Sequence, residues 1–586
     1  MNWPKPRETT EGSAIRGRKY ILFGNASLNG GIYNLFMEND KAIKIIPLGG
    51  LGAIGKNITL FEFKDDILIV DCGIMFPTDE MPGIDYIIPD FTYIRKNKAK
   101  VKAILVTHGH EDHIGAVPYL LREINAPIYA TKLSIGLIQS RLEELPPKKK
   151  PQFVEIKPRD RRQIGSFSVE FIKVNHSIIG GIGLALQTEV GTIIHTGDFK
   201  IDFSPVDGDV TDIFRFADYG EKGVLLLMSD STNAERSGFT QSESVLIDKL
   251  ADIFSSSRGR IIVATFASNI HRVQQVMEVA QRFNRKIAIS GHTMLKNVEI
   301  ANSLGYLNYR DDLLVDLSKS NTLPNKKLVI IGTGSQGEPM SALYRMAYGT
   351  HRHITAEKGD TVVITASVIP GNERMVTNVV NSLMKLGAEV YYDQDEGIHV
   401  SGHGSAKELK LMLAVTKPRF FMPIHGEYRH LKAHAGIAES LNIKPSRILI
   451  AENGDVLELT SKSFRKIDSI DISQIYVDGQ DIGDIESGVI KDRHVMSSDG
   501  IIVIVIVISE GMLARQPDIF SRGFVGNKED TIVELIRKDV HERVNRLLVE
   551  KKLNDDIVSS LKKGLRNFIF KLTRRNPLII VEILKV

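Results

Sequence analysis

The stretch from Thr107 to His113 reads Thr-His-Gly-His-Glu-Asp-His and constrains this chain more than any other. Three of the 16 histidines fall within six positions there, beside an aspartate. The apolar run Val101–Val106 before it has the length and β-branched content of a buried strand, and a helix is expected over Ile114–Arg122. The cluster therefore follows the carboxyl end of a strand, where open α/β sheets place their ligand sites.

Four side chains of this stretch can bind a metal ion: His108, His110, Asp112 and His113. His108 and His110 are two residues apart in an extended segment, so they point to one side. The other two follow the turn and can point back into the same cavity. Imidazole and carboxylate ligands without a thiolate suit zinc better than manganese or iron. The single cysteine, Cys72, excludes a Cys-based zinc site and a disulfide framework.

Other predicted strands are followed by residues of the same kind. The strands and their ligands are Phe167–Val174 with His176, Thr192–His195 with Asp198, and Phe420–Pro423 with His425. Seven ligands are too many for one tetrahedral ion and fit two ions about 3.5 to 4 Å apart, bridged by Asp198. A hydroxide between the ions would attack a phosphodiester. Asp71, which ends the strand Ile67–Val70, is expected behind them, where it would orient a ligand.

The strand-end ligands lie on both sides of a long alternation of strands and helices, which predicts a parallel α/β module. The simplest account is one α/β fold interrupted by an inserted domain. The expected parts are an N-terminal extension (1–41), the first part of the main domain (42–240), the inserted domain (241–398), the second part (399–459), a linker (460–485) and a C-terminal α+β domain (486–586).

The C-terminal part contains the most apolar run of the chain, Ile501–Ile508. Eight residues are too few for a membrane helix, which needs about 20, so a central strand buried on both faces is expected. The end of the chain is basic, through Lys562, Lys563, Arg566, Lys571, Arg574 and Arg575. Nucleic-acid contact and oligomerisation are both open for this part. The formal charge of +4 allows a polyanionic partner without demanding one.

Three further patterns have a structural and a functional interpretation. Gly50, Gly52 and Gly55 match a dinucleotide-binding pattern, but strands rather than a helix are expected next, which favours a tight turn beside the metal cavity. Gly332–Gly337 is either a set of turn glycines or a phosphate cradle. The basic stretch 148–162 is either a solvated face or a phosphate-backbone contact. The N-terminus lacks the apolar segment of a signal peptide, and a cytoplasmic protein without a membrane anchor is expected.

Thr107–His113, His176 and Asp198 resemble the motifs of the metallo-β-lactamase fold, and the inserted module with Asp230, His403 and His425 resembles its β-CASP branch. Within that branch the chain resembles the bacterial ribonuclease J family. The motifs that carry this likeness are Gly49–Gly52, Ser229–Glu235, Phe266–Asn269, Gly332–Gly337, His399–His403 and Pro517–Phe524. The likeness covers about residues 42–586. Two departures are Ala53, where the family usually has Glu, and Gly291–Met294, where it usually has Gly-Arg-Ser-Met.

The resemblance implies an αββα sandwich with an inserted β-CASP α/β domain and a small α+β C-terminal domain. It implies a ribonuclease with 5′-3′ exonuclease and endonuclease activity in RNA maturation, including rRNA processing, and in mRNA decay. Two Zn²⁺ ions per subunit are implied, one held by His108, His110 and His176 and the other by Asp112, His113 and His425. The RNA is expected to carry a 5′ monophosphate, and the protein to be a homodimer or homotetramer that meets RNA-degradation partners.

The same resemblance assigns catalytic and RNA-contacting residues. Asp112, Asp230 and His403 form the implied catalytic set, in which Asp230 supports the domain junction. His403 would act as general acid or stabilise the transition-state phosphate. The implied RNA contacts are Ser268, Asn269, His399, Val400, Ser401, Gly402 and His403.

Three rival functions are a small-molecule metallohydrolase on the same fold, a DNA nuclease of the β-CASP group, and a non-catalytic RNA-binding subunit. By resemblance, RNA-acting members carry a histidine at the position of His425, which DNA-repair relatives typically lack.

Overall fold

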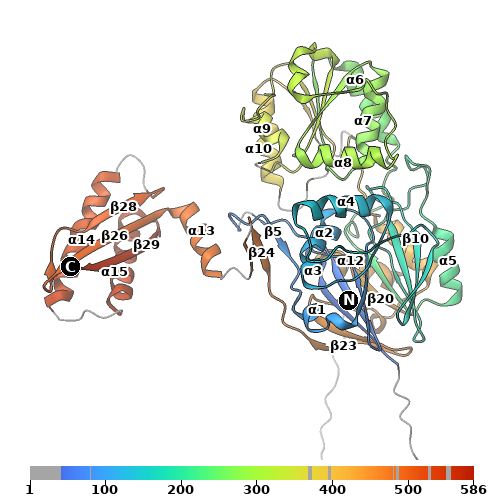
Figure 1. The fold of residues 1–586 in the computed structure, drawn as a ribbon, viewed down its shortest axis with the longest axis horizontal. Helices are drawn as coiled ribbons and strands as arrows, with labels where there is room; N and C mark the ends of the chain where they lie inside the picture. The colour runs from blue at the N-terminus through green and yellow to red at the C-terminus, as the bar shows by residue number, and fades with distance from the viewer. Residues whose placement is uncertain are drawn as a thin grey trace, which may run out of the picture. The chain divides into compact units, whose positions relative to one another are not determined.

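The structure is a computed structural model, shown in Figure 1. It describes residues 41–78, 81–338, 340–366, 368, 372–392, 397–479, 481–483, 487–524, 529–549 and 556–586. The extension expected over 1–41 lies outside the described residues except for its last position.

Two sheets stack face to face, with the strand orders β23-β22-β1-β3-β4-β6-β7-β8 and β20-β13-β12-β11-β10-β9. The strands of the first sheet are β1 (Ile43–Gly49), β3 (Ile58–Phe63), β4 (Asp66–Val70), β6 (Val101–Leu105), β7 (Ile128–Ala130), β8 (Phe153–Glu155), β22 (Asp455–Leu459) and β23 (Phe464–Ser469). Those of the second are β9 (Arg161–Ile164), β10 (Phe167–Lys173), β11 (Ile182–Gln187), β12 (Thr192–His195), β13 (Leu226–Asp230) and β20 (Phe420–Ile424). Apolar side chains of both inner faces, such as Phe61 and Phe171, form one core between the sheets.

Helices cover the outer face of each sheet. The first sheet packs against α1 (Thr92–Lys96), α2 (Glu111–Ile114), α3 (Val117–Glu123) and α4 (Lys132–Glu144). The second packs against α5 (Ile213–Lys222), α11 (Ala406–Thr416) and α12 (Tyr428–Ser440). Because every strand of such a sandwich has one face toward the other sheet and one toward helices, its central strands are buried on both faces, as β3 is. The predicted αββα sandwich is confirmed.

The chain leaves the second sheet after β13 and returns to it at β20, which pairs with β13 in parallel. Between them lies a separate sheet with the order β16-β15-β17-β14-β18-β19, in which every pair is parallel. Its strands are β14 (Ile261–Ala264), β15 (Lys286–Ser290), β16 (Leu314–Val315), β17 (Leu328–Gly332), β18 (Thr361–Ile364) and β19 (Glu389–Tyr391). The predicted parallel α/β insertion is therefore confirmed.

Helices cover both faces of the inserted sheet, as Figure 1 shows. The helices α6 (Val245–Ser256), α7 (Ile270–Arg282) and α8 (His292–Ser303) pack on one face. The helices α9 (Ala342–Ala347) and α10 (Glu373–Lys385) pack on the other. The loops after β14, β15 and β17, which carry the sequence motifs, all leave from the carboxyl edge of this sheet.

The segment expected as a linker, 460–485, contains three strands. β23 extends the large sheet beside β22, and β24 (Ile475–Asp478) pairs with both β25 (Asp481–Gly483) and β5 (Tyr86–Ile88). β23 lies at the edge of the sheet and buries only its first residue, Phe464. Its other side chains are exposed and mostly polar, so the sequence of this strand resembles that of a linker.

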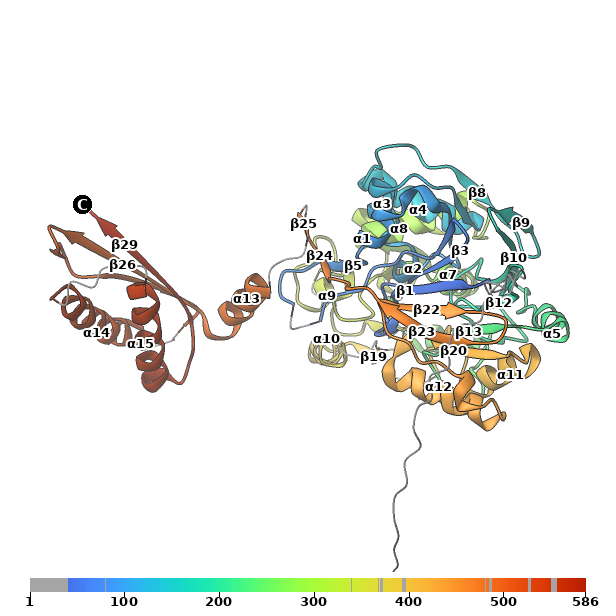
Figure 2. The ribbon, with the colours of Figure 1, turned by 90° about the horizontal axis from the view of Figure 1, so that it is seen from below.

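The C-terminal part contains α13 (Ser487–Asp499), β26 (Ile501–Ser509), β27 (Met512–Leu513), β28 (Asp518–Arg522), α14 (Glu529–Val549), α15 (Asp556–Thr573) and β29 (Leu578–Lys585). β26 lies between β28 and β29, so the predicted central position is confirmed. The predicted burial on both faces is wrong, because β26 alternates between buried and half-buried residues. The helices α14 and α15 lie on only one face of this sheet (Figure 2). Across the described ranges, none of the helices is long and apolar enough to span a membrane.

Candidate metal centre

The candidate ligands gather because several neighbouring strands end at the same edge of the sandwich. β4 and β6 are parallel neighbours in the first sheet, and β12, β13 and β20 are parallel neighbours in the second. Each is followed by, or ends in, a histidine or an aspartate of the predicted set. Their ligand atoms form three groups, and within each group every atom lies within 4.8 Å of the others. The first patch has His108, His110 and His176, and the second has Asp112, His113, Asp198 and His425. The third group shares Asp198 and His425 with the second and adds Asp230 and His403.

In the first patch, imidazole nitrogens face one another. The Nδ1 atom of His110 lies 3.0 Å from Nε2 of His108 and 3.1 Å from Nε2 of His176. Two nitrogens bound to one tetrahedral zinc at 2.0–2.1 Å are roughly 3.3 Å apart. The spacing of these three nitrogens therefore fits one ion bound between them.

Asp198 joins the two patches. Its Oδ2 atom lies 3.2 Å from Nε2 of His113, 3.4 Å from that of His425, 3.7 Å from that of His108 and 3.9 Å from that of His176. One carboxylate oxygen thus faces ligand atoms of both groups, which is the position of a bridging ligand. The second patch is completed by Asp112, whose Oδ2 lies 3.4 Å from Nε2 of His425 and 3.5 Å from Nε2 of His113.

The outer nitrogens of these rings are held by neighbouring groups. Asp71 accepts a hydrogen bond from Nδ1 of His113 (2.8 Å) and from the backbone N–H and hydroxyl of Thr107. Nδ1 of His176 lies 2.7 Å from the carbonyl oxygen of Gly402, which it reaches as a donor. Such outer partners fix the tautomer and ring orientation of metal-binding histidines. Asp71 therefore lies directly behind the imidazole of His113.

The helix after the metal motif begins three residues earlier than predicted and is interrupted. α2 starts at Glu111, with His110 as the extended residue before it, and α3 follows only at Val117. Glu111 and Asp112 occupy the first turn, where the helix dipole favours acidic side chains. Asp112 and His113 therefore project from a helix rather than from a loop.

The pKa values divide the histidines into two groups. Burial and the neighbouring His113 hold the pKa of His108 well below its ordinary value, and burial lowers the pKa of His110 to about 4. Burial and His403 likewise lower the pKa of His176. These imidazoles are neutral near pH 7, which is the form that binds a metal ion.

In the second patch burial is outweighed by carboxylates. Asp198 and Asp112 raise the pKa of His425 to about 10, and the same two groups raise that of His113. Although burial opposes it, the neighbouring imidazolium groups hold the pKa of Asp198 well below its ordinary range. Protons on the two histidines thus balance the carboxylate charge, and a bound metal cation would replace those protons. The donor set fits a metal pair.

Asp230 and His403 lie at the rim of this cluster. Nδ1 of His403 donates to Oδ2 of Asp230 at 2.8 Å, and its ring stacks on that of His425 with centroids 5.3 Å apart. The side chain of His403 is 19% exposed, whereas those of His176 and His425 are 2% and 4% exposed. His403 is therefore more accessible than these two candidate ligands.

The expected RNA-contacting residues differ in accessibility. Ser268, His399, Ser401 and His403 are partly exposed. Asn269, Val400 and Gly402 are buried. The side chain of Asn269 caps α7 by accepting the backbone N–H of Arg272 at 3.0 Å. These three residues could contact RNA only through their backbone groups, and they give structural support to the partly exposed residues beside them.

Three supporting residues were missed by sequence reasoning. The hydroxyl of Thr232 lies 2.7 Å from Nδ1 of His425, and the amide of Asn57 lies 3.1 Å from Nε2 of His113. Asn233 donates to the hydroxyl of Ser401 and to the carbonyl of His403. Thr232 and Asn233 lie inside the motif Ser229–Glu235, so their proximity to Asp230 was the available signal.

The glycine loop before β3 lies beside the metal centre, as predicted. Its residues Leu51–Gly52 (β2) pair with Gly426–Glu427 (β21), directly after His425. Ala53, the first departure from the family pattern, forms an isolated bridge with Gly426. No helix follows the glycines among the described residues 50–70, which agrees with the rejected nucleotide role.

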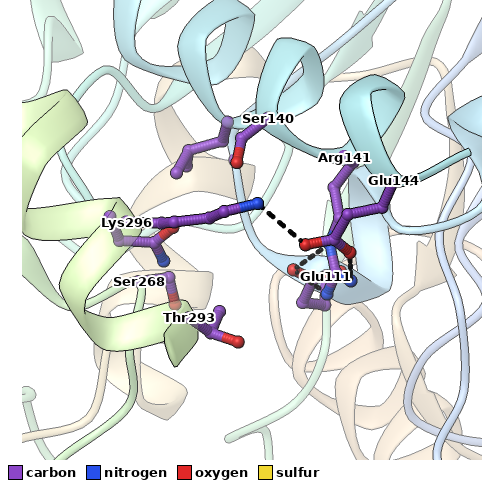
Figure 3. Close-up of a pocket in the computed structure, with 10 residues that line it drawn as sticks. Glu111, Ser140, Arg141, Glu144, Ser268, Thr293 and Lys296 are labelled. Atoms are coloured by element: carbon purple, nitrogen blue, oxygen red, sulfur yellow. Dashed lines mark hydrogen bonds and ion pairs between the residues drawn. The ribbon is translucent and has the colours of Figure 1, made fainter. Parts of the chain in front are cut away.

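A pocket lies next to the metal motif, between α4 and α8. It is lined by Gly109, Glu111, Leu137, Ser140, Arg141, Glu144, Ser268, Thr293, Lys296 and Asn297. Nζ of Lys296 lies 3.1 Å from a carboxylate oxygen of Glu144, and Arg141 pairs with both Glu111 and Glu144. Figure 3 shows Lys296 pointing toward this group. Thr293 belongs to the second departure from the family pattern, so that departure lines this pocket.

Four family models match the chain. They are the metallo-beta-lactamase superfamily (residues 51–236), the ribonuclease J beta-CASP domain (258–383), the Zn-dependent metallo-hydrolase RNA specificity domain (393–444) and the ribonuclease J C-terminal domain (488–586). The matches follow one another along the chain and span the sandwich, the inserted sheet and the C-terminal part.

Curated relatives match over most of their length. Ribonuclease J 1 of Streptococcus pyogenes is 44% identical over 92% of this chain and 97% of its own. Ribonuclease J of Thermus thermophilus is 42% identical over 93% and 95%, and ribonuclease J2 of Bacillus subtilis is 39% identical over 94% and 100%. A solved protein of unknown function from Enterococcus faecalis V583 has a TM-score of 0.50 at 15% identity, over 71% of this chain and 100% of its own, which shows the fold alone.

Proposed function

This chain belongs to the ribonuclease J family and is a metal-dependent ribonuclease, and from that premise we propose that it uses two zinc ions per subunit for 5′-3′ exonuclease and endonuclease activity in RNA maturation and mRNA decay. The observation that carries the two-ion proposal is the position of Asp198, whose Oδ2 faces four histidine Nε2 atoms. A donor set of histidines and aspartates without cysteine supports zinc.

Each ligand has a proposed place in this arrangement. His108, His110 and His176 would hold one ion, Asp112, His113 and His425 the other, and Asp198 would bridge them. When bound, the ions supply an activated water and stabilise charge on the phosphodiester. Asp71 would keep His113 oriented through the hydrogen bond to its Nδ1.

His403 is proposed to act on the leaving oxygen or on the transition-state phosphate. Its partial exposure leaves Nε2 free to approach a substrate, while Asp230 holds Nδ1. An aspartate in that position fixes the tautomer and the orientation of the imidazole. Replacing His403 by Ala should slow turnover about 10²- to 10⁴-fold and leave the metal content unchanged.

The 5′ preference is supported by the partly exposed side chains of Ser268, His399 and Ser401. Hydroxyl and imidazole groups can hydrogen-bond a terminal phosphate. The homodimer or homotetramer and the RNA-degradation partners are proposed from family membership. Sedimentation of the purified chain tests the oligomer.

The deciding experiment compares one RNA with a 5′ monophosphate, triphosphate or hydroxyl, each labelled at the 3′ end. A 5′-3′ exonuclease with end recognition degrades the monophosphate form fastest. Equal rates on all three would reject the 5′-end assignment, and loss of a DNA of the same sequence at the same rate would favour the DNA nuclease. Turnover of a chromogenic lactam without loss of RNA would favour the small-molecule hydrolase.

A further inference from the structure

The second C-terminal helix and the turn after it have an unusual charge pattern. Between Asp556 and Glu582 the sequence contains no acidic residue. In that interval stand six basic residues: Lys562, Lys563, Arg566, Lys571, Arg574 and Arg575. A run of like charges costs self-repulsion in the folded state, so a ligand of opposite charge would relieve it.

Packing determines which side of α15 faces outward. Leu561, Leu565 and Ile569, spaced at i, i+4 and i+8, are buried and share a core with Ile536 and Val540 of α14. Lys563, Arg566, Lys571 and Arg574 are exposed. The three cations within α15, Lys563 to Lys571, span about 12 Å at 1.5 Å per residue, and Arg574 directly follows the helix. The cations therefore form one outward basic face.

The basic face differs from other cationic stretches in its lack of ion pairs. Within the part of the chain that the structure describes, none of its cations is within ion-pair distance of a carboxylate. In α14, by contrast, Arg537 pairs with Glu534 and Arg543 with Asp539.

The basic stretch 148–162, which the sequence left open as a phosphate contact, has its three arginines paired. Arg159, Arg161 and Arg162 contact Asp212, Glu170 and Asp160. Paired cations have less charge to offer a polyanion, so the face of α15 is the stronger candidate.

An aromatic ring lies within the basic face. Phe570 is 38% exposed, and the guanidinium of Arg574 lies 5.6 Å from the centre of its ring. Proteins that bind single-stranded nucleic acid without sequence preference combine cations along the backbone with aromatic rings on which bases stack. An aromatic ring next to a guanidinium supplies both contacts in one place.

We propose that this basic face, formed by Lys563, Arg566, Phe570 and Lys571 of α15 and by Arg574 directly after it, is an auxiliary binding surface for single-stranded RNA. It would hold the backbone of a long substrate without reading its sequence. The choice of RNA as the polyanion rests on the proposed ribonuclease function. An acidic protein partner, a second copy of the chain, or a merely solvated face are the competing interpretations.

The test variant is the full chain with Lys563→Gln, Arg566→Gln and Lys571→Gln. The matched control is Arg515→Gln, Arg522→Gln and Lys538→Gln, which removes the same charge from other exposed positions of the same part of the chain. Binding of a long unstructured RNA is measured in EDTA, so that cleavage does not interfere, at several salt concentrations. A third variant, Lys563→Arg with Lys571→Arg, keeps the charge and should bind like the wild type.

The test variant should bind the long RNA about tenfold more weakly, and the slope of log K against log salt should fall by about 0.7 for each phosphate that the protein no longer neutralises. Phe570→Ala should weaken binding by about 1 to 3 kcal/mol, roughly 5- to 150-fold, if one base stacks there. Turnover of a five-nucleotide RNA should be unchanged in every variant.

Three outcomes would overturn the proposal. They are an unchanged salt slope in the test variant, an equal loss in the matched control, and a change in sedimentation with unchanged RNA binding, which would assign the face to a second copy. If the wild type degrades no RNA, the proposed function fails, yet the binding comparison in EDTA still decides this surface.

Discussion

Two buried clusters of charged and titratable side chains lie within the same fold, and they are built in opposite ways. In the first patch of the metal centre, nitrogen faces nitrogen, as in the 3.0 Å approach of His108 to His110. In the second cluster, at the segments that enter and leave the inserted sheet, opposite charges are paired. There Arg272 donates to Glu243 at 2.7 Å, and Lys200 lies 3.7 Å from the same carboxylate.

The second cluster is charge-paired by the protein's own groups, although Oε1 of Glu243 accepts no hydrogen bond. Arg272 is fully buried and also donates to the carbonyl oxygens of Thr365 and Ile398, the latter directly before His399. An added cation would relieve the facing nitrogens of the metal centre, whereas the charges of the Arg272 cluster already balance one another. The comparison separates a site built to bind from a cluster built to hold the two crossing segments in place.

The largest expected effect is at the metal centre. Replacing His110 by Ala removes the nitrogen that faces both His108 and His176, so the first ion loses a ligand. RNA turnover should fall at least about 10³-fold, a loss of about 4 kcal/mol in transition-state stabilisation. The metal content and the RNA affinity of the same variant are also measured, and the variant should still bind RNA. Full activity of this variant would contradict the two-metal proposal. The control is His494→Ala, which replaces a histidine at an exposed position.

The second effect is on stability and not on metal binding. Replacing Arg272 by Met leaves Glu243 buried without its main partner, which should cost about 3 to 5 kcal/mol of unfolding free energy. Adding Glu243→Leu should recover most of that loss, because an apolar pair avoids the desolvation penalty. Denaturant unfolding and metal analysis of the single and double variants check this. If the Arg272→Met variant lost metal but kept its unfolding free energy, the Arg272 cluster would support metal binding and not stability.

The Arg272 cluster also predicts a pH dependence. Burial alone would raise the pKa of Glu243, but Arg272 and Lys200 lower it below the ordinary value of 4.5. A depressed pKa in the folded state contributes stability that is present above the unfolded pKa and is lost as pH falls through the folded value. The stability difference between wild type and Arg272→Met/Glu243→Leu should therefore shift in favour of the variant below about pH 4.5. A difference that stays constant down to about pH 3 would contradict this.

A smaller effect is expected behind the ligands. Asp71→Asn keeps an acceptor for Thr107 but places no charge beside Nδ1 of His113. Metal affinity should fall about 10- to 100-fold, as is typical for the outer partners of metal-binding histidines. Competition with a chelator measures it, and the free energy of unfolding of the metal-free protein should change less than that of Arg272→Met. An affinity equal to that of the wild type would show that Asp71 is only structural.

The candidate metal ligands could be predicted from the sequence, but the Arg272 cluster could not, and the reason is physical. Ligands such as His176 and Asp198 follow apolar strands, and the length and composition of such strands can be recognised locally. Arg272 and Glu243 lie on a helix and in a loop, and their pairing depends on tertiary packing that no local pattern reports. The burial of β26 failed similarly, because an apolar run does not reveal whether helices cover one face or two. The start of α2 was missed because acidic residues that begin a helix were taken for part of a loop.

The smallest effect is expected at a third set of charges, around the pocket of Figure 3. Its charges are paired, as in the Arg272 cluster, but they are partly exposed to solvent. Lys296 and Glu144 join α8 to α4, but their side chains are 26% and 49% exposed. Exposed pairs contribute about 0 to 1 kcal/mol because water screens them. Lys296→Ala should therefore change RNA turnover less than about fivefold and leave metal content alone. A double-mutant cycle with Glu144→Ala measures the coupling energy directly. A value above about 2 kcal/mol would mean that the pair behaves like the buried Arg272 cluster and holds the inserted sheet against the metal motif through Arg141 and Glu111.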